Sequence, residues 1–167
     1  MEFAVWNSLN GIVMTLPPPT LTHFCDLTVE LDSIRELGDG RAGKRRIIPI
    51  IGGTVRGPKI NGRILNLGAD WQTIFSNNVA ELDTRYAFET DDGAIIEIQN
   101  FGYRHGPAGT MARVAAGETV SPTEYYMRTS AKMETGDPRY SWVNSMMFVG
   151  TGGRNRASVL MSLYCVT

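Results

Sequence analysis

The sequence predicts an all-β fold, an antiparallel up-and-down β-barrel with one short helix. From Leu21 to the end of the chain, short runs of alternating apolar and polar residues are separated by turn residues, a pattern typical of strands. Glycine, at 18 of 167 residues, exceeds its average share of about 7%, which indicates many tight turns. Roughly eight to ten antiparallel strands with almost no helix fit a two-sheet sandwich or a closed barrel. We favour the barrel, because neither face of several strands is uniformly apolar.

Two parts of the chain differ in character: an N-terminal arm, residues 1–20, and a single β-barrel domain, residues 21–167. The arm ends in Pro17-Pro18-Pro19, and a proline run neither continues a helix nor donates hydrogen bonds to a sheet. We expect the arm to pack on the outside of the domain or on a neighbouring molecule.

The domain begins with a predicted strand over residues 21–31, and a glycine-rich connector follows over residues 37–45. Residues 46–57 form a second β run. Its Pro49 and Gly52-Gly53 indicate an edge or a sharp bend.

Two hairpins are predicted next. Asn61-Gly62, between apolar residues, is a signal for a two-residue turn. The clearest hairpin covers residues 82–104, where two alternating strands flank Asp91-Asp92-Gly93, whose Asp-Gly pair suits a type I′ turn.

The second half of the domain contains the one predicted helix, residues 110–116, with Thr110 as its cap and Gly117 ending it. Gly150-Thr151-Gly152-Gly153 is expected to be a loop between two strands. The remaining predicted strands cover residues 125–134, 140–150 and 158–166.

Composition excludes several classes of function. Sixteen Lys and Arg against 17 Asp and Glu give a net charge of −1, without the basic excess that nucleic acid binding requires. No apolar run approaches the roughly 18 residues of a membrane span, and the first residues lack a basic signal region. We therefore expect no nucleic acid or membrane partner and a cytoplasmic protein.

Metal and nucleotide cofactors are not expected either. Cys25 and Cys165 are the only cysteines, and His23 and His105 are the only histidines, so no zinc or iron–sulfur spacing is present. The sequence has neither a GxGxxG nor a GxxxxGK[ST] motif, which disfavours dinucleotides and phosphate loops.

Three long segments, residues 52–72 (GGTVRGPKINGRILNLGADWQ), 82–104 and 124–144 (EYYMRTSAKMETGDPRYSWVN), resemble a bacterial and fungal family catalogued as domain of unknown function 3237. The likeness extends from about Leu21 to Val166. It implies a small antiparallel barrel, similar to lipocalin-like (calycin-like) barrels, that forms a homo-oligomer. It implies no reaction, so function must be argued from residues.

Asp70 is the preferred proton carrier. It stands beside Trp71, and a carboxyl group held against an apolar ring in a pocket has its pKa raised towards a useful acid or base value. The alternative is that Asp70 caps a turn while Trp71 is part of the core.

A second candidate set consists of polar residues on the predicted strands. Guanidinium, phenol and amide groups hold carbonyl, enolate or carboxylate oxygens and stabilise negative charge as it develops. The alternative is a solvated face on which Asp83 and Arg85 pair with Glu97 or Arg128. The members are Asp83, Arg85, Asn100, Arg104, Tyr126, Arg128 and Asn144, with Trp142 as an aromatic wall.

Two functions follow from these residues. In the first, a cofactor-independent enzyme holds a hydrophobic or aromatic metabolite in the barrel, and Asp70, helped by Arg85, Tyr126 and Arg128, catalyses proton transfer, isomerisation, cyclisation or dehydration. In the second, the barrel is a non-catalytic carrier for a small apolar molecule. A structural or interaction module is a third, weaker hypothesis.

Overall fold

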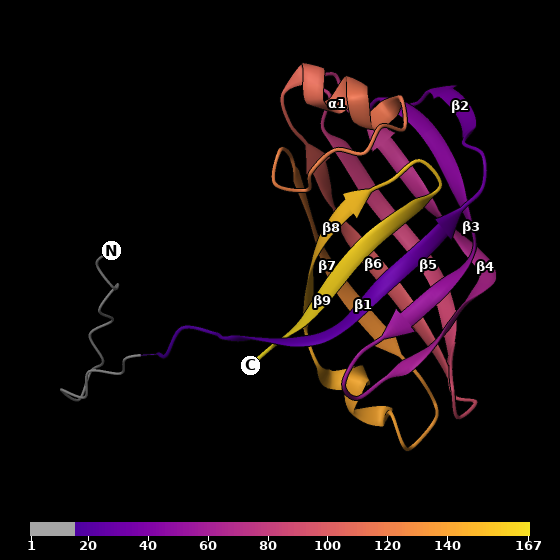
Figure 1. Ribbon diagram of the computed structural model, residues 1–167, viewed down its shortest axis with the longest axis vertical. Coiled ribbons are helices and arrows are strands. Elements are labelled where there is room, and N and C mark those ends of the chain that lie inside the picture. The colour runs from indigo at the N-terminus through magenta and orange to yellow at the C-terminus, as the bar shows by residue number, and fades with distance from the viewer. Residues whose placement is uncertain (1–15) are drawn as a thin grey trace.

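Nine strands, one α-helix and one 3-10 helix make up the fold of the computed structural model, which describes residues 16–167 (Figure 1). Most of the predicted arm, residues 1–15, lies outside the described residues. The elements are β1 (Leu21–Leu31), β2 (Arg35–Asp39), β3 (Lys44–Arg56), β4 (Asn61–Ile74), β5 (Ala80–Thr90), β6 (Ile95–His105), α1 (Ala108–Ala115), β7 (Tyr126–Glu134), η1 (Ser141–Ser145), β8 (Phe148–Arg154) and β9 (Ser158–Val166).

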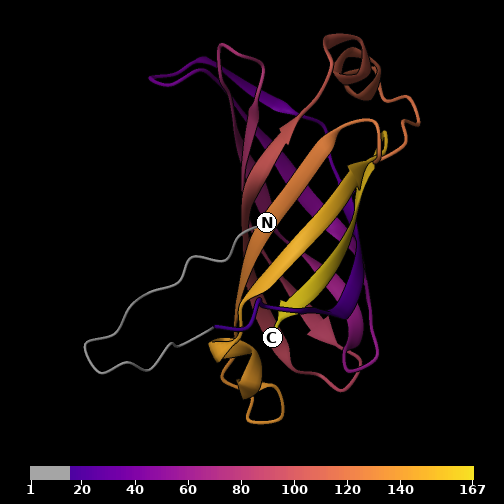
Figure 2. The same ribbon diagram turned by 90° about the vertical axis from the view of Figure 1, so that its left-hand side faces the viewer.

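Pairing of β1 with both β9 and β3 closes the sheet. The strand order is β1-β9-β8-β7-β6-β5-β4-β3, and the antiparallel β1–β3 ladder joins its two ends. The predicted antiparallel barrel is therefore confirmed, with eight strands in the closed ring. The ninth, β2, pairs only with β3 and lies at the same end of the barrel as α1 (Figures 1 and 2).

The predicted bend in β3 is a β-bulge. Glu30 pairs with Gly52 and Leu31 pairs with Ile50, so Ile51 is an extra residue opposite β1. Gly53 has a φ of 132°, and a Cβ there would lie 1.9 Å from the Thr28 carbonyl oxygen. This position therefore requires glycine, because a side chain would collide with the neighbouring strand.

The two ends of the barrel interior differ in composition. At the η1 end, Phe24 packs against Phe148, with ring centroids 4.8 Å apart, and meets Trp142 edge-on at 5.7 Å. Buried aliphatic side chains fill the space around them, including Ile96 and Val143. The interior towards α1 contains most of the buried polar side chains, and it is described below.

Several strand predictions are confirmed, and β1 and β9 have the predicted bounds. The prediction of a two-residue turn at Asn61-Gly62 is wrong. Asn61 is the first residue of β4, and its side-chain amide bonds both the N–H and the carbonyl of Gly57, so it closes a turn that comes earlier in the chain. Gly62 lies inside β4.

Two further predictions are corrected at β8. Residues 141–145 form η1 rather than a strand, and the expected loop over residues 150–153 is strand. Gly150 and Gly152 lie in that strand for a steric reason: a Cβ at Gly150 would lie 2.6 Å from the Thr129 hydroxyl oxygen, and one at Gly152 would lie 3.2 Å from the Met127 sulfur. The glycines are spacers inside the barrel.

Turn and cap details also differ. The β5–β6 hairpin is confirmed, but only Gly93 in its loop has positive φ, whereas a type I′ turn needs two such residues. The helix starts earlier than predicted, at Ala108, with Pro107 instead of Thr110 at its N-cap. Gly117, at a φ of 78°, ends it as expected. Within residues 16–167, no helix is long and apolar enough to cross a membrane.

Adjacent isoleucines on β6 provide a test of barrel closure. Ile96 is fully buried and Ile95 is half exposed. Since deleting a buried isoleucine side chain leaves a cavity, Ile96→Ala should lower the free energy of unfolding by about 2–5 kcal/mol. Ile95→Ala should lower it by less than about 1 kcal/mol. Urea unfolding followed by circular dichroism measures both, and equal losses would contradict the assigned inner face.

Candidate functional site

A row of polar side chains crosses three neighbouring strands inside the barrel. Asp70 of β4 pairs with Thr84 of β5, and Thr84 pairs with Asn100 of β6. Directly paired residues on one face of a sheet place their side chains about 5 Å apart. Inside the closed barrel Asn100 is only 3% exposed, and Asp70 and Thr84 are partly buried.

Three arginines lie around this row. Arg104, 5% exposed, follows Asn100 on the same face of β6, while Arg46 of β3 and Arg154 of β8 are partly buried. Asp70 acts electrostatically on all three arginines, Glu36 of β2 acts more strongly than Asp70 on Arg46, and Arg46 and Arg154 act on Arg104. The polar end of the barrel thus contains three guanidinium groups around one carboxyl group.

Hydrogen bonds fix the outer part of this cluster. Arg46 Nε donates to Gln72 Oε1 at 2.8 Å, and Gln72 Nε2 donates to Asp70 Oδ2 at 2.5 Å. The backbone N–H of Arg154 donates to the hydroxyl oxygen of Tyr125 at 2.7 Å. Gln72 therefore links one arginine to the carboxyl group and sets its orientation.

Burial raises the pKa of Asp70 above its ordinary value, because the ionised carboxylate loses its hydration. The amide of Gln72, the hydroxyl of Thr84 and the charge of Arg104 offset part of that effect. Burial also lowers the pKa of Arg104 to about 10, and repulsion from Arg154 and Arg46 adds to the lowering.

Four buried polar atoms in this region have no partner with hydrogen-bonding geometry among the described residues: Asp70 Oδ1, Asn100 Oδ1, Arg104 Nε and Arg104 Nη1. Buried polar groups in proteins are almost always paired, and leaving one unpaired costs about 1–3 kcal/mol. A group of them in one region is the arrangement expected of a binding site.

A small cavity of about 30 Å³ lies beside the row. Its polar walls are Asp70, Thr84, Asn100 and Thr129, and its apolar walls include Met161 and Tyr86. Asn100 Nδ2 and the Thr129 hydroxyl both point to the Met161 sulfur, at 2.9 and 3.6 Å. Because a buried water needs about 10–15 Å³, the cavity has room for a group the size of a carboxylate.

The structure brings together three of the sequence-predicted site residues, Asp70, Asn100 and Arg104. It does not bring the others to them. Arg85 lies on the outer face, 3.3 Å from Glu97, and its alternation partner Asp83 is also exposed. The remaining outer residues are Trp71, Tyr126 and Arg128.

Trp142 and Asn144 lie at the opposite end of the barrel, on η1. Trp142 packs on Phe24, and Asn144 exchanges two hydrogen bonds, each of 2.9 Å, with the backbone of Thr135. Both contacts hold η1 against the strands, at the end of the barrel opposite Asp70.

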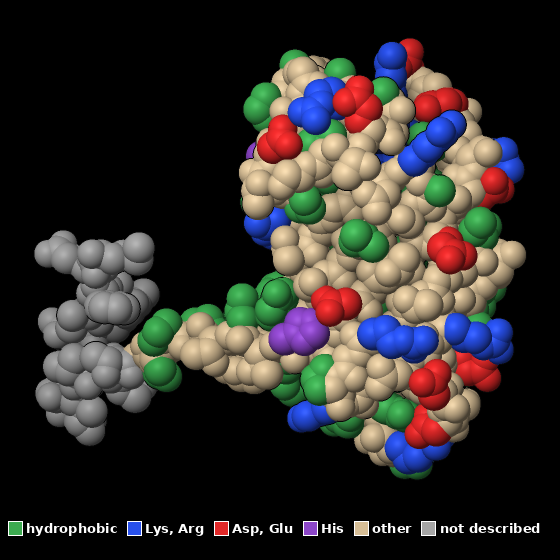
Figure 3. Space-filling view, viewed as in Figure 1, with side chains coloured by type: hydrophobic (Ala, Val, Ile, Leu, Met, Phe, Trp, Pro, Cys, Tyr) green, Lys and Arg blue, Asp and Glu red, His purple; other side chains and the backbone are tan. Residues whose placement is uncertain are grey.

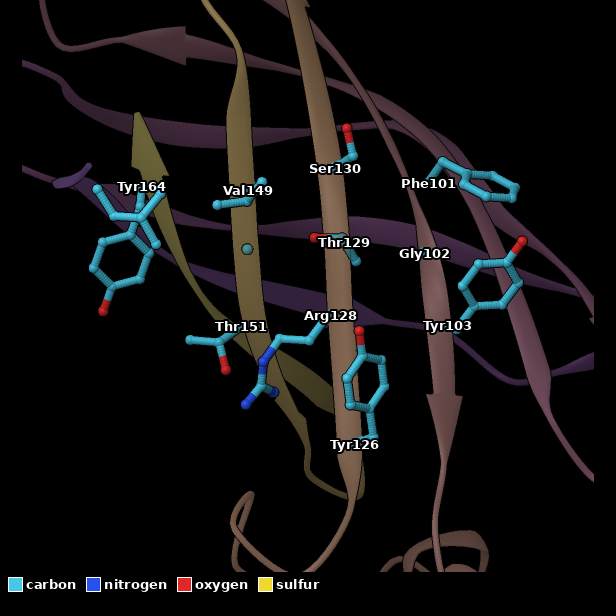
Figure 4. Close-up of a pocket in the computed structure, with 12 residues that line it drawn as sticks. Phe101, Gly102, Tyr103, Tyr126, Arg128, Thr129, Ser130, Val149, Thr151 and Tyr164 are labelled. Atoms are coloured by element: carbon cyan, nitrogen blue, oxygen red, sulfur yellow. The ribbon is translucent and has the colours of Figure 1, made fainter. Parts of the chain in front are cut away.

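A larger groove of about 630 Å³ lies on the outside of the barrel (Figure 4). Tyr126 and Arg128 line it, with Arg128 over the Tyr126 ring at 5.4 Å. Phe101 and Tyr103 lie on one side of these two residues and Tyr164 lies on the other. Every charged or phenolic side chain in this groove reaches water. Charged groups on the surface over β1, β3 and β9 are likewise mixed in sign (Figure 3).

Sequence reasoning missed five residues of the inner site: Arg46, Gln72, Thr84, Tyr125 and Arg154. Thr84 carried a signal, since it alternates with Leu82, Tyr86 and Phe88, the more apolar face of its strand. The two arginines carried none, because each stands near a strand end, where an outward side chain is equally compatible with the pattern.

Within residues 16–167, no three His, Cys, Asp or Glu side chains are placed to hold a metal ion. The inner site also contains more cationic than anionic side chains, so it suits an anion better than a metal ion. The site offers one carboxylate, two amides, hydroxyls and guanidinium groups.

Comparison with known proteins places the chain among uncharacterised relatives. Residues 19–166 match the model of the protein family of unknown function DUF3237. The chain belongs to this family. The UPF0311 protein RPA1785 of Rhodopseudomonas palustris is 41% identical over 150 residues, which cover 89% of this chain and 98% of that protein.

Solved structures share the barrel. A beta-barrel like protein from Acinetobacter baumannii superposes with a TM-score of 0.81 at 45% identity, covering 92% of this DUF3237 chain and 99% of that one. A structure described as an enzyme from Penicillium herquei superposes with a TM-score of 0.69 at 16% identity, covering 92% and 98%. At that identity the likeness shows the fold alone.

The raised pKa of Asp70 leads to a prediction for stability. Its folded-state pKa lies above the unfolded value of about 3.9, so ionising Asp70 costs folding free energy at neutral pH and not in acid. Asp70→Asn should therefore be more stable than the wild type at pH 7, and the gain should shrink as the pH falls towards 4. Urea unfolding at a series of pH values measures the difference.

Asp26 provides a control of opposite sign. A hydrogen bond from Ser162 lowers the pKa of Asp26, so its charge stabilises the fold above the unfolded pKa and this contribution is lost as the pH falls. Asp26→Asn should be less stable at pH 7, with the deficit shrinking in acid. An Asp70→Asn protein that behaves in the same way would show that its arginine neighbours outweigh its burial.

Proposed function

We propose that this DUF3237 protein is a cofactor-independent enzyme that binds a small organic molecule at the polar end of its barrel and catalyses proton transfer with Asp70 as acid and base. The observation that carries the proposal is a buried carboxyl group of raised pKa beside an unpaired guanidinium group, that of Arg104. A proton carrier works best when its pKa is near the working pH, and burial moves Asp70 in that direction.

Each inner residue has a role in this proposal. Asp70 Oδ1, which has no partner with hydrogen-bonding geometry in residues 16–167, takes a proton from the bound molecule and returns it at another atom. Arg104 Nε and Nη1 donate to the oxygen on which negative charge develops, and Asn100 Oδ1 orients a donor of the substrate. Gln72 keeps Asp70 Oδ2 occupied, so that only one oxygen reacts.

The chemistry open to such a site is isomerisation, cyclisation or dehydration, since each needs a proton moved and an oxyanion stabilised. The fold is compatible with catalysis, because the Penicillium herquei protein of similar fold is an enzyme. We do not include Arg85, Tyr126 and Arg128 in the mechanism, since side chains on the outer face cannot contact a molecule inside the barrel.

A test follows from removing the basicity of Asp70 alone. The protein is incubated in D₂O with a protein-free small-molecule extract of its source organism, and mass spectrometry follows compounds that change mass or disappear. Asp70→Asn should slow these changes by about 100-fold or more, the usual contribution of a general acid or base. Glu97→Gln, an outer carboxylate on β6, should leave them unchanged.

Conversion by Asp70→Asn at the wild-type rate would overturn the role of Asp70. If the wild type instead retains one compound through gel filtration and converts none, the carrier function replaces catalysis.

A further inference from the structure

The unpaired atoms of the inner site are hydrogen-bond donors and hydrogen-bond acceptors, and each kind requires a complementary group on a ligand. Arg104 Nε and Nη1 are hydrogen-bond donors, so they call for an acceptor. Asp70 Oδ1 and Asn100 Oδ1 are acceptors when Asp70 is ionised, so they call for a donor. A ligand that satisfies all four presents an acceptor group and a donor group close together.

The positive charges around the site indicate that the acceptor group of the ligand is an anion. Among the described residues, none of Arg46, Arg104 and Arg154 forms an ion pair within 4 Å. Asp70 acts on all three, and the exposed Glu36 of β2 acts in addition on Arg46. Burial lowers the pKa of Arg104, and repulsion from Arg154 and Arg46 adds to the lowering. An anion would relieve this repulsion, and guanidinium groups bind oxyanions through charge-assisted hydrogen bonds.

Size and polarity limit the part of the ligand that enters. The cavity of about 30 Å³ has room for a few heavy atoms, and its polar wall is the row Asp70, Thr84 and Asn100. An uncharged apolar group there would leave the Oδ1 atoms of the lining residues Asp70 and Asn100 unpaired, at a cost for each of them. The reactive end of the substrate is therefore small and polar, and any bulkier part lies towards the barrel mouth.

We propose that the substrate is an organic oxyanion that carries a hydroxyl group next to its charged group, with the oxyanion against Arg104 and Arg154 and the hydroxyl towards Asp70 and Asn100. A hydroxycarboxylate and the enol of an oxocarboxylate both have this chemistry. The proposal rests on the proposed function, because the hydroxyl faces the atom that would accept a proton. It adds the class of substrate.

The test uses the smallest molecules with the relevant groups, so that shape does not decide the result. Glycolate has the carboxylate and the hydroxyl, acetate lacks the hydroxyl, and glycolamide lacks the charge. Each is titrated at constant ionic strength into ¹⁵N-labelled protein while NMR follows the Arg104 Nε–H and the Asn100 side-chain amide. Glycolate should bind about tenfold or more tightly than glycolamide, and more tightly than acetate.

Variants locate the binding. Arg104→Gln should remove the preference for glycolate over glycolamide. Arg154→Gln, at a partly buried position, should reduce it and guards against a folding defect at Arg104. Arg63→Gln is the matched control, since Arg63 lies on the outer face of β4 and pairs there with Glu89; it should leave all three affinities unchanged.

Equal affinities for glycolate and glycolamide, or an unchanged preference in both Arg104→Gln and Arg154→Gln, would overturn the proposal. These measurements need no turnover, so their failure leaves the role of Asp70 in proton transfer intact. Conversely, selective glycolate binding combined with undiminished conversion by Asp70→Asn would support the substrate class and overturn the proposed catalysis.

Discussion

Burying Asp70 and Arg104 inside the barrel costs free energy, because each group loses its water and the two form no ion pair within 4 Å among the described residues. Other parts of the molecule must offset that cost. The aromatic and aliphatic packing at the η1 end provides this stabilisation, and closure of the sheet between β1 and β3 leaves no strand edge in the ring through which water would reach the polar row.

The position of Asp70 depends on the size of a bulge in β4. Ile64 pairs with Phe88 and Gly68 with Tyr86, so three β4 residues lie opposite one residue of β5. Because side chains alternate between the two faces of a strand, two extra residues leave Ile64 and Asp70 on the same inner face of β4. One extra residue would turn Asp70 outwards. Gly68, at a φ of 131°, makes this bulge possible, since a Cβ there would lie 2.1 Å from the Arg85 carbonyl oxygen.

This bulge explains why the sequence predicted the fold better than the site. Alternation and turn residues predicted most strands, because each depends on a few neighbouring residues. Which face of a strand turns inwards depends on closure and on register, which are set by distant pairings. Arg85 and Arg104 are both arginines between β-type neighbours, yet one is half exposed beside Glu97 and the other is buried.

Local sequence also misled where glycine had a structural role. The run from Gly150 to Gly153 has the composition of a loop, but two of its glycines lie inside the barrel against Thr129, Met127 and Met161. Their missing side chains leave space for those three residues next to the polar row. The glycine-rich strand therefore makes room for Met127, Thr129 and Met161, which line the cavity beside Asn100.

The outer groove is larger than the inner cavity, yet the inner site is the better candidate for chemistry. In the groove, Tyr126 and Arg128 contact water, so the charge of Arg128 is screened and a bound molecule would gain little from either side chain. Inside the barrel the same kinds of group act at low dielectric, where each unpaired donor or acceptor has a larger effect. In the proposed function, a molecule of complementary charge and hydrogen bonding would offset the free energy that burying Asp70 and Arg104 costs. A ligand of such a site would be selected by its polar groups first and by its volume second.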